Sequence, residues 1–381
     1  MLGRIEIINL INIFIILVVK FSFSLKISKI DVWPVNIGLT DDFVISQGAI
    51  SVAENAFVRI GLEGGTEGFG ELAPFEEVTG ETRDDGVRQI KKLAEGLIGK
   101  SVLDYRLISD EMKEKEPDQP APRCGLEIAI LDAYCRLKKI PMWALWSKAP
   151  RQNLMTDITI PILSYEKSME LARHWHLKGF QTLKMKVGID EEKELGLITD
   201  INKMFPGFSF IIDANQGFHP DQAISFINAL SRKGLNIILF EQPNDRFDLE
   251  GMARIKRSTT VPIAADEAVF TAEDAKRVVE MEAADVINLK IMKSGVFETL
   301  EIISVAVSAG LELMIGGMVE TRIGMGCSLA LAQSFPEIKF LDLDTPLLMS
   351  EDLLEGGYQY DGPMIISGNE PGLGIYPLVL Q

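Results

Sequence analysis

Three acidic residues each end a short apolar run. Asp213 closes FIID, Glu241 closes NIILFE and Asp266 closes PIAAD. If these runs are neighbouring parallel strands, their carboxylates meet at one mouth, where like charges raise one another's pKa unless a cation neutralises them. A hard divalent ion with oxygen ligands, such as Mg²⁺, suits that role. The alternative for any single acid is a helix cap or an arginine partner.

Lysines occupy the corresponding places on other runs. Lys184 and Lys186 lie in QTLKMK, and Lys290 ends VINLK. Residues i and i+2 of a strand share a face, so the first two lysines point the same way. A lone K-M-K favours an exposed edge or a salt-bridged pair. In a ring of eight strands, however, Lys186 and Lys290 face each other, where one takes a proton from a substrate carbon and the other returns it. We expect crowding of cations to lower the pKa of one lysine.

Eight short apolar runs recur at intervals of 24 to 28 residues, and each except the last precedes a helix-length segment. This alternation predicts an α/β fold, a modified TIM barrel (β/α)7β over residues 146–350. Pro346 indicates that the last helix is missing or displaced. An open doubly wound sheet is the alternative, but no G-x-G-x-x-G follows the first strands. The expected strand ends are Ile162, Lys186, Asp213, Glu241, Asp266, Lys290, Gly316 and Asp342.

The residues before the predicted barrel show a different sequence pattern. Residues 25–145 begin with alternating strand patterns around a Gly64-Gly65 pair, which is typical of a hairpin turn, and continue with helical patterns. This predicts an α+β capping domain. We expect, in order, a helix over 83–97, a loop over 111–122 and a helix over 123–137.

Both ends of the chain lie outside these patterns. Residues 7–19 form an apolar run that Lys20 ends, and a membrane-spanning helix needs about 20 apolar residues. We expect residues 1–24 to be an extension or a misplaced start and the protein to be cytoplasmic; the alternative is a secretory signal peptide and export. Residues 351–381 lack the barrel pattern, and we expect them to pack back on the capping domain.

Composition excludes several classes of function. The 381 residues carry a net charge of −17, which argues against nucleic acid as a partner. Three histidines and three cysteines argue against histidine-based metal sites, Ser-His-Asp catalysis and a disulfide framework. We expect a small-molecule substrate and no membrane partner, and homo-oligomer formation stays open.

Five motifs in this order and at this spacing resemble the enolase superfamily, in its muconate-lactonizing subgroup. They are Lys184-Met-Lys186, Asp213-Ala-Asn-Gln-Gly217, Glu241-Gln-Pro243, Ala265-Asp-Glu267 and Asn288-Leu-Lys-x-x-Lys-Ser-Gly295. The resemblance implies that Lys186 and Lys290 are the catalytic acid/base pair and that Asp213, Glu241 and Asp266 hold one Mg²⁺. It also implies that Lys184 steadies the substrate carboxylate. We expect Lys293, in the last motif, to lie beyond the strand end.

Within that subgroup the chain is similar to dipeptide epimerases of the L-Ala-D/L-Glu epimerase kind, through Asp342-Leu-Asp344 and Met318-Val-Glu-Thr321. Asp342 and Asp344 share one face, so we expect them to bind the free ammonium of a dipeptide. The alternative is that one of them pairs with Arg322. The implied substrate-binding residues are Lys184, Asp342, Asp344, Met318, Glu320 and Thr159.

The side chain of the inverted residue is a separate question. Epimerases selective for Ala-Glu carry an arginine a few residues after a first-domain phenylalanine, where this chain has Gln47 and Gly48 after Phe43. We therefore expect a neutral, apolar or cationic C-terminal residue. The alternative activities are N-acylamino acid racemase, o-succinylbenzoate synthase and muconate cycloisomerase. A non-catalytic barrel is the alternative outside enzymes.

Overall fold

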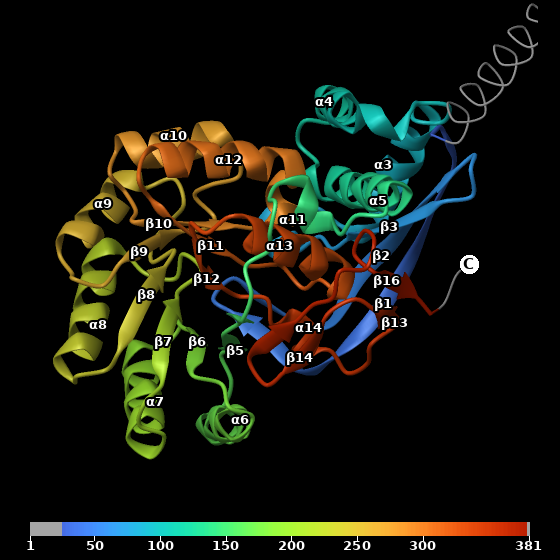
Figure 1. Cartoon of the computed structure of the whole chain (residues 1–381). Coiled ribbons are helices and arrows are strands. Elements are labelled where there is room, and N and C mark those ends of the chain that lie inside the picture. Colours follow the sequence, from blue (N-terminus) through green and yellow to red (C-terminus); the bar gives the residue numbers. More distant parts are fainter. Residues whose placement is uncertain (1–24, 379–381) are drawn as a thin grey trace, which may run out of the picture.

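The computed structural model describes residues 25–378, and the expectations for residues 1–24 lie outside them. The chain begins with an antiparallel sheet of order β1-β2-β3 (Figure 1). Its strands are β1 (Ile27–Ile45), β2 (Gly48–Leu62) and β3 (Glu67–Leu72). The Gly64-Gly65 turn lies between β2 and β3 as expected, and Gly65 has a φ of +82°, which glycine adopts without strain.

Helices cover one face of this sheet. Those that pack on it are α3 (Arg83–Glu95) and α5 (Pro120–Lys138), while α4 (Tyr105–Lys115) packs on α5. The same part of the chain also contains the single turn α2 (Glu76–Thr79) and two short 3₁₀ turns, Val102–Asp104 and Met142–Leu145. Helix α5 lies directly on β3, because a Cβ on Gly70 would come 2.0 Å from the carbonyl oxygen of Gly125. The expected loop over 111–122 is wrong at both ends. Its first five residues belong to α4 and its last three to α5, because the exposed charged face of α4 has the composition of a loop.

Eight parallel strands follow, in the order of the chain from β5 to β12. They are β5 (Ile158–Ile160), β6 (Thr182–Lys186), β7 (Ser209–Asp213), β8 (Ile237–Glu241), β9 (Ile263–Ala265), β10 (Val286–Leu289), β11 (Glu312–Ile315) and β12 (Ile338–Leu341). Each ends within two residues of its expected end. The sheet curls until its outer strands meet, where the Asp157 N–H donates to the Leu341 carbonyl at 3.0 Å. The fold-class prediction is confirmed.

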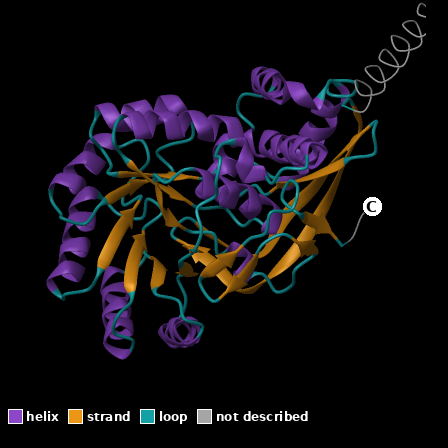
Figure 2. Ribbon diagram, in the orientation of Figure 1, coloured by secondary structure: helices purple, strands orange, loops and turns teal. Residues whose placement is uncertain are grey.

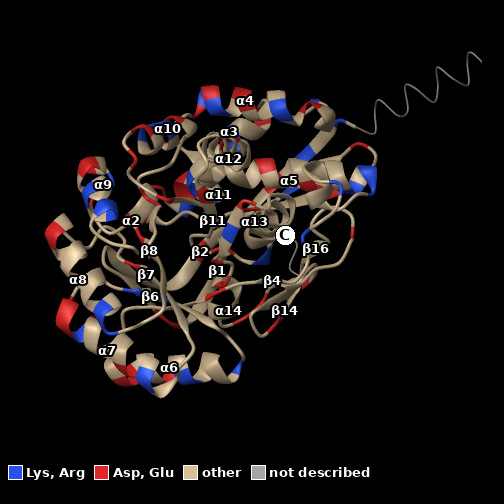
Figure 3. Ribbon diagram, turned by 60° about the vertical axis from the view of Figure 1, so that its left-hand side comes forward, with Lys and Arg blue, Asp and Glu red and all other residues tan. Residues whose placement is uncertain are grey.

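Helices surround this sheet on the outside (Figure 2). They are α6 (Tyr165–Leu177), α7 (Glu191–Met204), α8 (Pro220–Arg232), α9 (Leu249–Arg257), α10 (Ala272–Glu280), α11 (Ile291–Ser294), α12 (Val296–Ser308), α13 (Arg322–Ser334) and the single turn α14 (Thr345–Leu348). The shortness of α14 agrees with the reading of Pro346. Acidic and basic residues share the outer surfaces of the helices from α6 to α10 (Figure 3). Within residues 25–378, no helix combines the length and the apolar character that crossing a membrane requires.

The C-terminal segment lies against both parts of the molecule (Figure 1). Its strands β13 (Leu354–Gly356) and β16 (Ile375–Pro377) pair with each other, while β14 (Gln359–Asp361) and β15 (Met364–Ile366) form a sheet with β4 (Leu154–Met155). On the capping side, Asp132 of α5 accepts from the Leu373 N–H at 2.7 Å. On the barrel side, the Arg322 guanidinium of α13 donates to Asp352 at 2.7 Å.

Candidate active site

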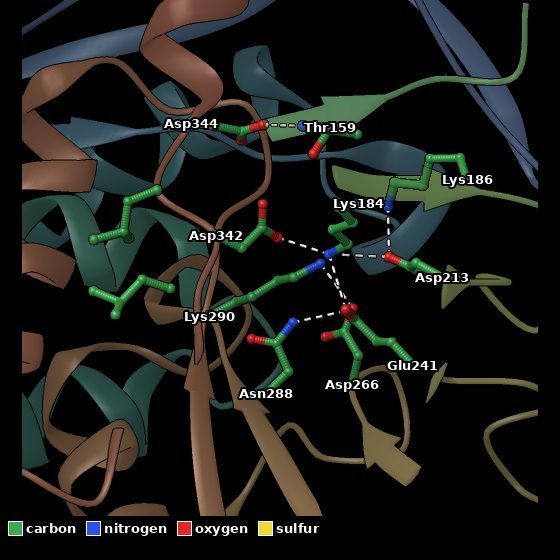
Figure 4. A network of polar contacts seen from close by, with 12 residues as sticks. Thr159, Lys184, Lys186, Asp213, Glu241, Asp266, Asn288, Lys290, Asp342 and Asp344 are labelled. Carbon is green, nitrogen blue, oxygen red and sulfur yellow. Dashed lines mark hydrogen bonds and ion pairs between the residues drawn. The ribbon is translucent and has the colours of Figure 1, made fainter. Parts of the chain in front are cut away.

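Two lysines of β6 reach the acidic residues at the ends of the neighbouring strands (Figure 4). The Nζ atoms of Lys184 and Lys186 lie 3.1 and 2.7 Å from Oδ2 of Asp213. Lys184 also lies 2.9 Å from Oε2 of Glu241 and 2.7 Å from Oδ2 of Asp342. All five side chains are buried. The lysines thus share one face of β6, and Lys184 joins acids from three different strands.

A second pair of lysines meets the third acid. Nζ of Lys290 lies 2.7 Å from Oδ2 of Asp266, and Nζ of Lys293 lies 2.6 Å from its Oδ1. Lys293 lies beyond the end of β10, as expected, but its side chain still reaches Asp266. The single turn of α11 carries it back toward β9, and its side chain is 1% exposed.

The pKa values of the three acids shift in different directions. Burial and the neighbouring Asp213 carboxylate raise the pKa of Glu241 to about 8. Burial also opposes ionisation of Asp213, but Lys186, Lys184 and Lys290 outweigh it and hold its pKa at about 2. For Asp266, Lys290 and Lys293 likewise overcome burial and lower the pKa.

These three carboxylates are donors of the type that a hard divalent cation prefers. They come from adjacent positions at the ends of β7, β8 and β9, and all are hard oxygen donors. Two of their buried oxygens, Glu241 Oε2 and Asp266 Oδ2, accept no hydrogen bond and have only ion pairs with lysine. Asn288 Nδ2 donates to the other oxygen of Glu241 at 2.7 Å and so orients it.

The lysine electrostatics differ from one expectation. The sequence predicts that neighbouring cations lower the pKa of a catalytic lysine. Burial and the Lys184 ammonium do act in that direction on Lys290. The carboxylates of Asp266, Glu241 and Glu267 together outweigh them and raise the pKa of Lys290. Lys293 is the buried lysine whose pKa is lowered, chiefly by burial.

A second acidic cluster lies beside the first. Among the described residues, Asp157, Asp342 and Asp344 offer carboxylate oxygens that all lie within 4.8 Å of one another. Oδ2 of Asp344 accepts the Thr159 N–H at 2.6 Å, whereas its Oδ1 is buried without a partner. Burial and Asp342 raise the pKa of Asp344 to about 7. Arg322 does not pair with either acid of Asp342-Leu-Asp344, because its guanidinium binds the C-terminal segment.

Sequence reasoning missed Asp157. Both of its oxygens are buried without hydrogen-bond partners, and burial together with Asp342 and Asp344 raises its pKa well above the ordinary value. A signal was present, because Asp157 stands two residues before Thr159, directly before β5, and in extended backbone such residues point to the same side. Asn215 was missed as well. Its Oδ1 accepts from Lys186 at 3.0 Å, and it stands in the same motif as Asp213.

A small cavity of about 30 Å³ lies between these clusters and the capping domain. Seven of the expected site residues line it: Thr159, Lys184, Lys186, Lys290, Met318, Asp342 and Asp344. Glu320 does not. It is fully buried close to Gly317 and Gly324, where burial and Glu71 raise its pKa to about 8. The capping domain adds an apolar wall that the sequence had not assigned to the site: Phe43, Ile45, Phe75 and Val78.

The chain as a whole is similar to known proteins. Residues 167–378 match the family model described as Enolase C-terminal domain-like. The chain belongs to this family. A relative from Populus trichocarpa, named L-Ala-D/L-amino acid epimerase, is 38% identical over 347 residues, which cover 90% of this chain and 82% of the relative. An aromatic dipeptide epimerase from Herpetosiphon aurantiacus is 36% identical over 350 residues, covering 92% and 98%.

A solved structure is similar over nearly the whole described chain. The dipeptide epimerase from Enterococcus faecalis in complex with Mg and the dipeptide L-Leu-L-Tyr superimposes with a TM-score of 0.88 at 33% identity, covering 92% of this chain and 99% of that one. The resemblance to the enolase superfamily is therefore confirmed. The names of these relatives also confirm the prediction of an isomerase of the epimerase and racemase class.

Proposed function

We propose that this enzyme is a Mg²⁺-dependent dipeptide epimerase that inverts the α-carbon of the C-terminal residue. The observation that carries the proposal is the arrangement of Lys186 and Lys290, which line one cavity from strands four places apart in the barrel. Two amines on opposite sides of a bound carbon can remove and return its proton on opposite faces. The dipeptide epimerases among the relatives support this reading.

The metal site belongs to the same proposal. Asp213, Glu241 and Asp266 would hold one Mg²⁺ per subunit, which when bound would stabilise the negative charge that develops on the substrate carboxylate as the α-proton leaves. Lys184 contributes a further positive charge beside that carboxylate. Its ammonium stays protonated, because Asp342, Glu241 and Asp213 outweigh its burial and raise its pKa.

The second acidic cluster supplies the other end of the substrate site. Asp342 and Asp344 line the cavity, and Oδ1 of Asp344 has no partner in the protein. A carboxylate oxygen left unpaired in a buried site favours a charged donor, and the free α-ammonium of a dipeptide supplies one. Substrates without this ammonium, such as N-acylamino acids, would leave Oδ1 of Asp344 without a partner.

The capping domain would set the preference for the inverted side chain. Phe43, Ile45, Phe75 and Val78 give the cavity an apolar wall, and the cations that line it are Lys184, Lys186 and Lys290, which already have roles. A glutamate side chain would therefore lack a positive partner. We infer a preference for apolar C-terminal residues. A cavity of about 30 Å³ holds about one water, so entry of a dipeptide requires the capping segments to move.

The test is hydrogen exchange in D₂O. The enzyme is incubated with Mg²⁺ and a library of L,L-dipeptides, and mass spectrometry reports deuterium at the α-carbon. We expect exchange and inversion at the C-terminal residue of dipeptides such as L-Ala-L-Leu and L-Ala-L-Phe, with slower reaction of L-Ala-L-Glu. Each substrate is also run N-acetylated. Equal or faster turnover of the acetylated compounds would instead assign an N-acylamino acid racemase.

A further inference from the structure

Lys293 is a buried lysine with a complete set of partners. Its Nζ lies 2.6 Å from Oδ1 of Asp266, 2.5 Å from the main-chain oxygen of Asp266 and 3.0 Å from the main-chain oxygen of Asn288. An ammonium has three donors, and all three are used. Lysines are rarely fully buried unless paired, so this one has a specific structural task.

The task concerns the orientation of one carboxylate. Because a single ammonium holds both Oδ1 and the main-chain oxygen of Asp266, the side chain cannot rotate without breaking a charge-assisted hydrogen bond. Its other oxygen, Oδ2, accepts no hydrogen bond and lies 2.7 Å from Nζ of Lys290. One oxygen of Asp266 is thus anchored on the outer side, and the other is directed into the site.

The local backbone makes this arrangement accessible. Lys290 ends the strand, and α11 then forms a single turn in which the Lys293 N–H donates to the Lys290 carbonyl at 3.1 Å. Gly295 ends the turn with a φ of +88°, a conformation that glycine adopts readily. The two lysines of one motif therefore reach opposite oxygens of the same acid. Lys293 does not line the small cavity that holds Lys186 and Lys290.

We propose that Lys293 is a positioning residue that fixes Asp266 in the orientation needed to bind the divalent cation. This inference rests on the Mg²⁺ site of the proposed function. Simple electrostatics predicts the reverse effect, because a cation next to a metal ligand repels the metal and its removal should tighten binding. The sign of the change in Mg²⁺ affinity therefore separates positioning from mere charge.

The experiment measures Mg²⁺ binding to the full chain by calorimetric titration after treatment with EDTA, without any dipeptide. Wild type is compared with Lys293→Met, which keeps the length and removes the donors. Residues that orient metal ligands change metal affinity by about 10- to 100-fold, and we expect a weakening of this size. Lys276→Met is the matched control, since Lys276 lies on the surface of α10 and pairs with Glu273; we expect wild-type affinity.

Two further variants keep the inference falsifiable. Lys293→Arg retains the charge, but its planar guanidinium cannot reproduce the three-way contact, so it should also weaken Mg²⁺ binding. Lys293→Arg also replaces Lys293→Met in the test if the methionine variant does not fold. In an Asp266→Asn background, Lys293→Met should change the affinity less than it does in wild type, because the lysine acts through Asp266.

The outcomes separate the two proposals. Unchanged or tighter Mg²⁺ binding in Lys293→Met or Lys293→Arg overturns the positioning role and leaves the metal site intact. Wild type that binds no Mg²⁺ overturns both the site and this inference. If Mg²⁺ binding weakens as expected but no dipeptide is epimerised, the proposed activity fails and the role of Lys293 stands.

Discussion

Nζ of Lys184, in the second barrel strand, lies 2.7 Å from Oδ2 of Asp342, which follows the eighth strand. The same ammonium contacts Asp213 and Glu241. One lysine therefore connects the carboxylates proposed for the metal with those proposed for the substrate ammonium. The two ends of the substrate site are electrostatically linked, so a change at either end is expected to affect the other.

Removal of the divalent cation should abolish activity. We expect EDTA to stop epimerisation and Mg²⁺ to restore it, because Asp213, Glu241 and Asp266 bring three carboxylates to one mouth. Asp266→Asn keeps the shape of the side chain and removes one charge. It should weaken Mg²⁺ binding by about 100-fold or more, because loss of a residue that only supports a metal ligand already weakens binding by about 10- to 100-fold. Asp221→Asn, on the exposed surface of α8, should match wild type. Full turnover after exhaustive chelation would contradict the metal site.

Loss of one lysine should separate proton exchange from inversion. Lys290→Ala removes the amine on one side of the substrate, so epimerisation should fall by about 10²- to 10⁴-fold in both directions. Lys186 alone would still permit deuterium exchange at one stereochemistry, which ¹H NMR in D₂O can follow. Lys276→Ala is the exposed control. Unimpaired epimerisation by Lys290→Ala would show that this lysine is not a catalytic base.

Asp344→Asn should weaken recognition of the substrate ammonium. The amide oxygen can still accept the Thr159 N–H, so the backbone contact is retained while the charge is lost. Truncating one partner of a buried charge pair costs about 2 to 5 kcal/mol, which predicts a fall in kcat/KM for dipeptides of roughly 30-fold or more. Asp361→Asn, exposed on β14, serves as control. An equal loss for N-acetylated substrates would show that Asp344 does not bind the ammonium.

A buried acid of the capping domain should make the protein less stable as pH rises. Burial raises the pKa of Glu81 from 4.5 to about 7, and its Oε2 has no partner. Between these two pH values the folded state keeps a proton that the unfolded state releases. Below pH 4.5 Glu81 is protonated in both states and does not change the free energy of unfolding. As pH rises through 7, Glu81 lowers the free energy of unfolding by up to about 3 kcal/mol.

Glu81→Gln should remove this pH dependence. The amide keeps an acceptor for the Ala121 N–H and stays neutral at every pH. Denaturant unfolding should show near-wild-type stability at pH 5 and higher stability than wild type at pH 8. Glu77→Gln, on the exposed end of α2, is the control for substitution as such. Parallel pH profiles of Glu81→Gln and wild type would rule out a buried, protonated Glu81.

The sequence by itself determined the barrel and the chemical content of its mouth. Apolar runs that end in Asp213, Glu241 or Lys186 leave little room for another interpretation, because strands buried on both faces admit a charge only where it meets a partner. The regular spacing of these ends then ordered them around a ring. The predicted fold class is confirmed, because it depends on features local to each strand and helix.

Only the tertiary structure decided which atoms meet. Distances between elements remote in the chain decide three features of the site. They bring Lys293 back to Asp266, place Asp157 close to Asp342 and keep Glu320 out of the cavity. Periodicity reports which face a side chain takes, but it carries no information on how closely two faces pack. Phe43 and Phe75 line the cavity only because the capping domain packs against the barrel. The sequence pattern of either part does not predict that contact.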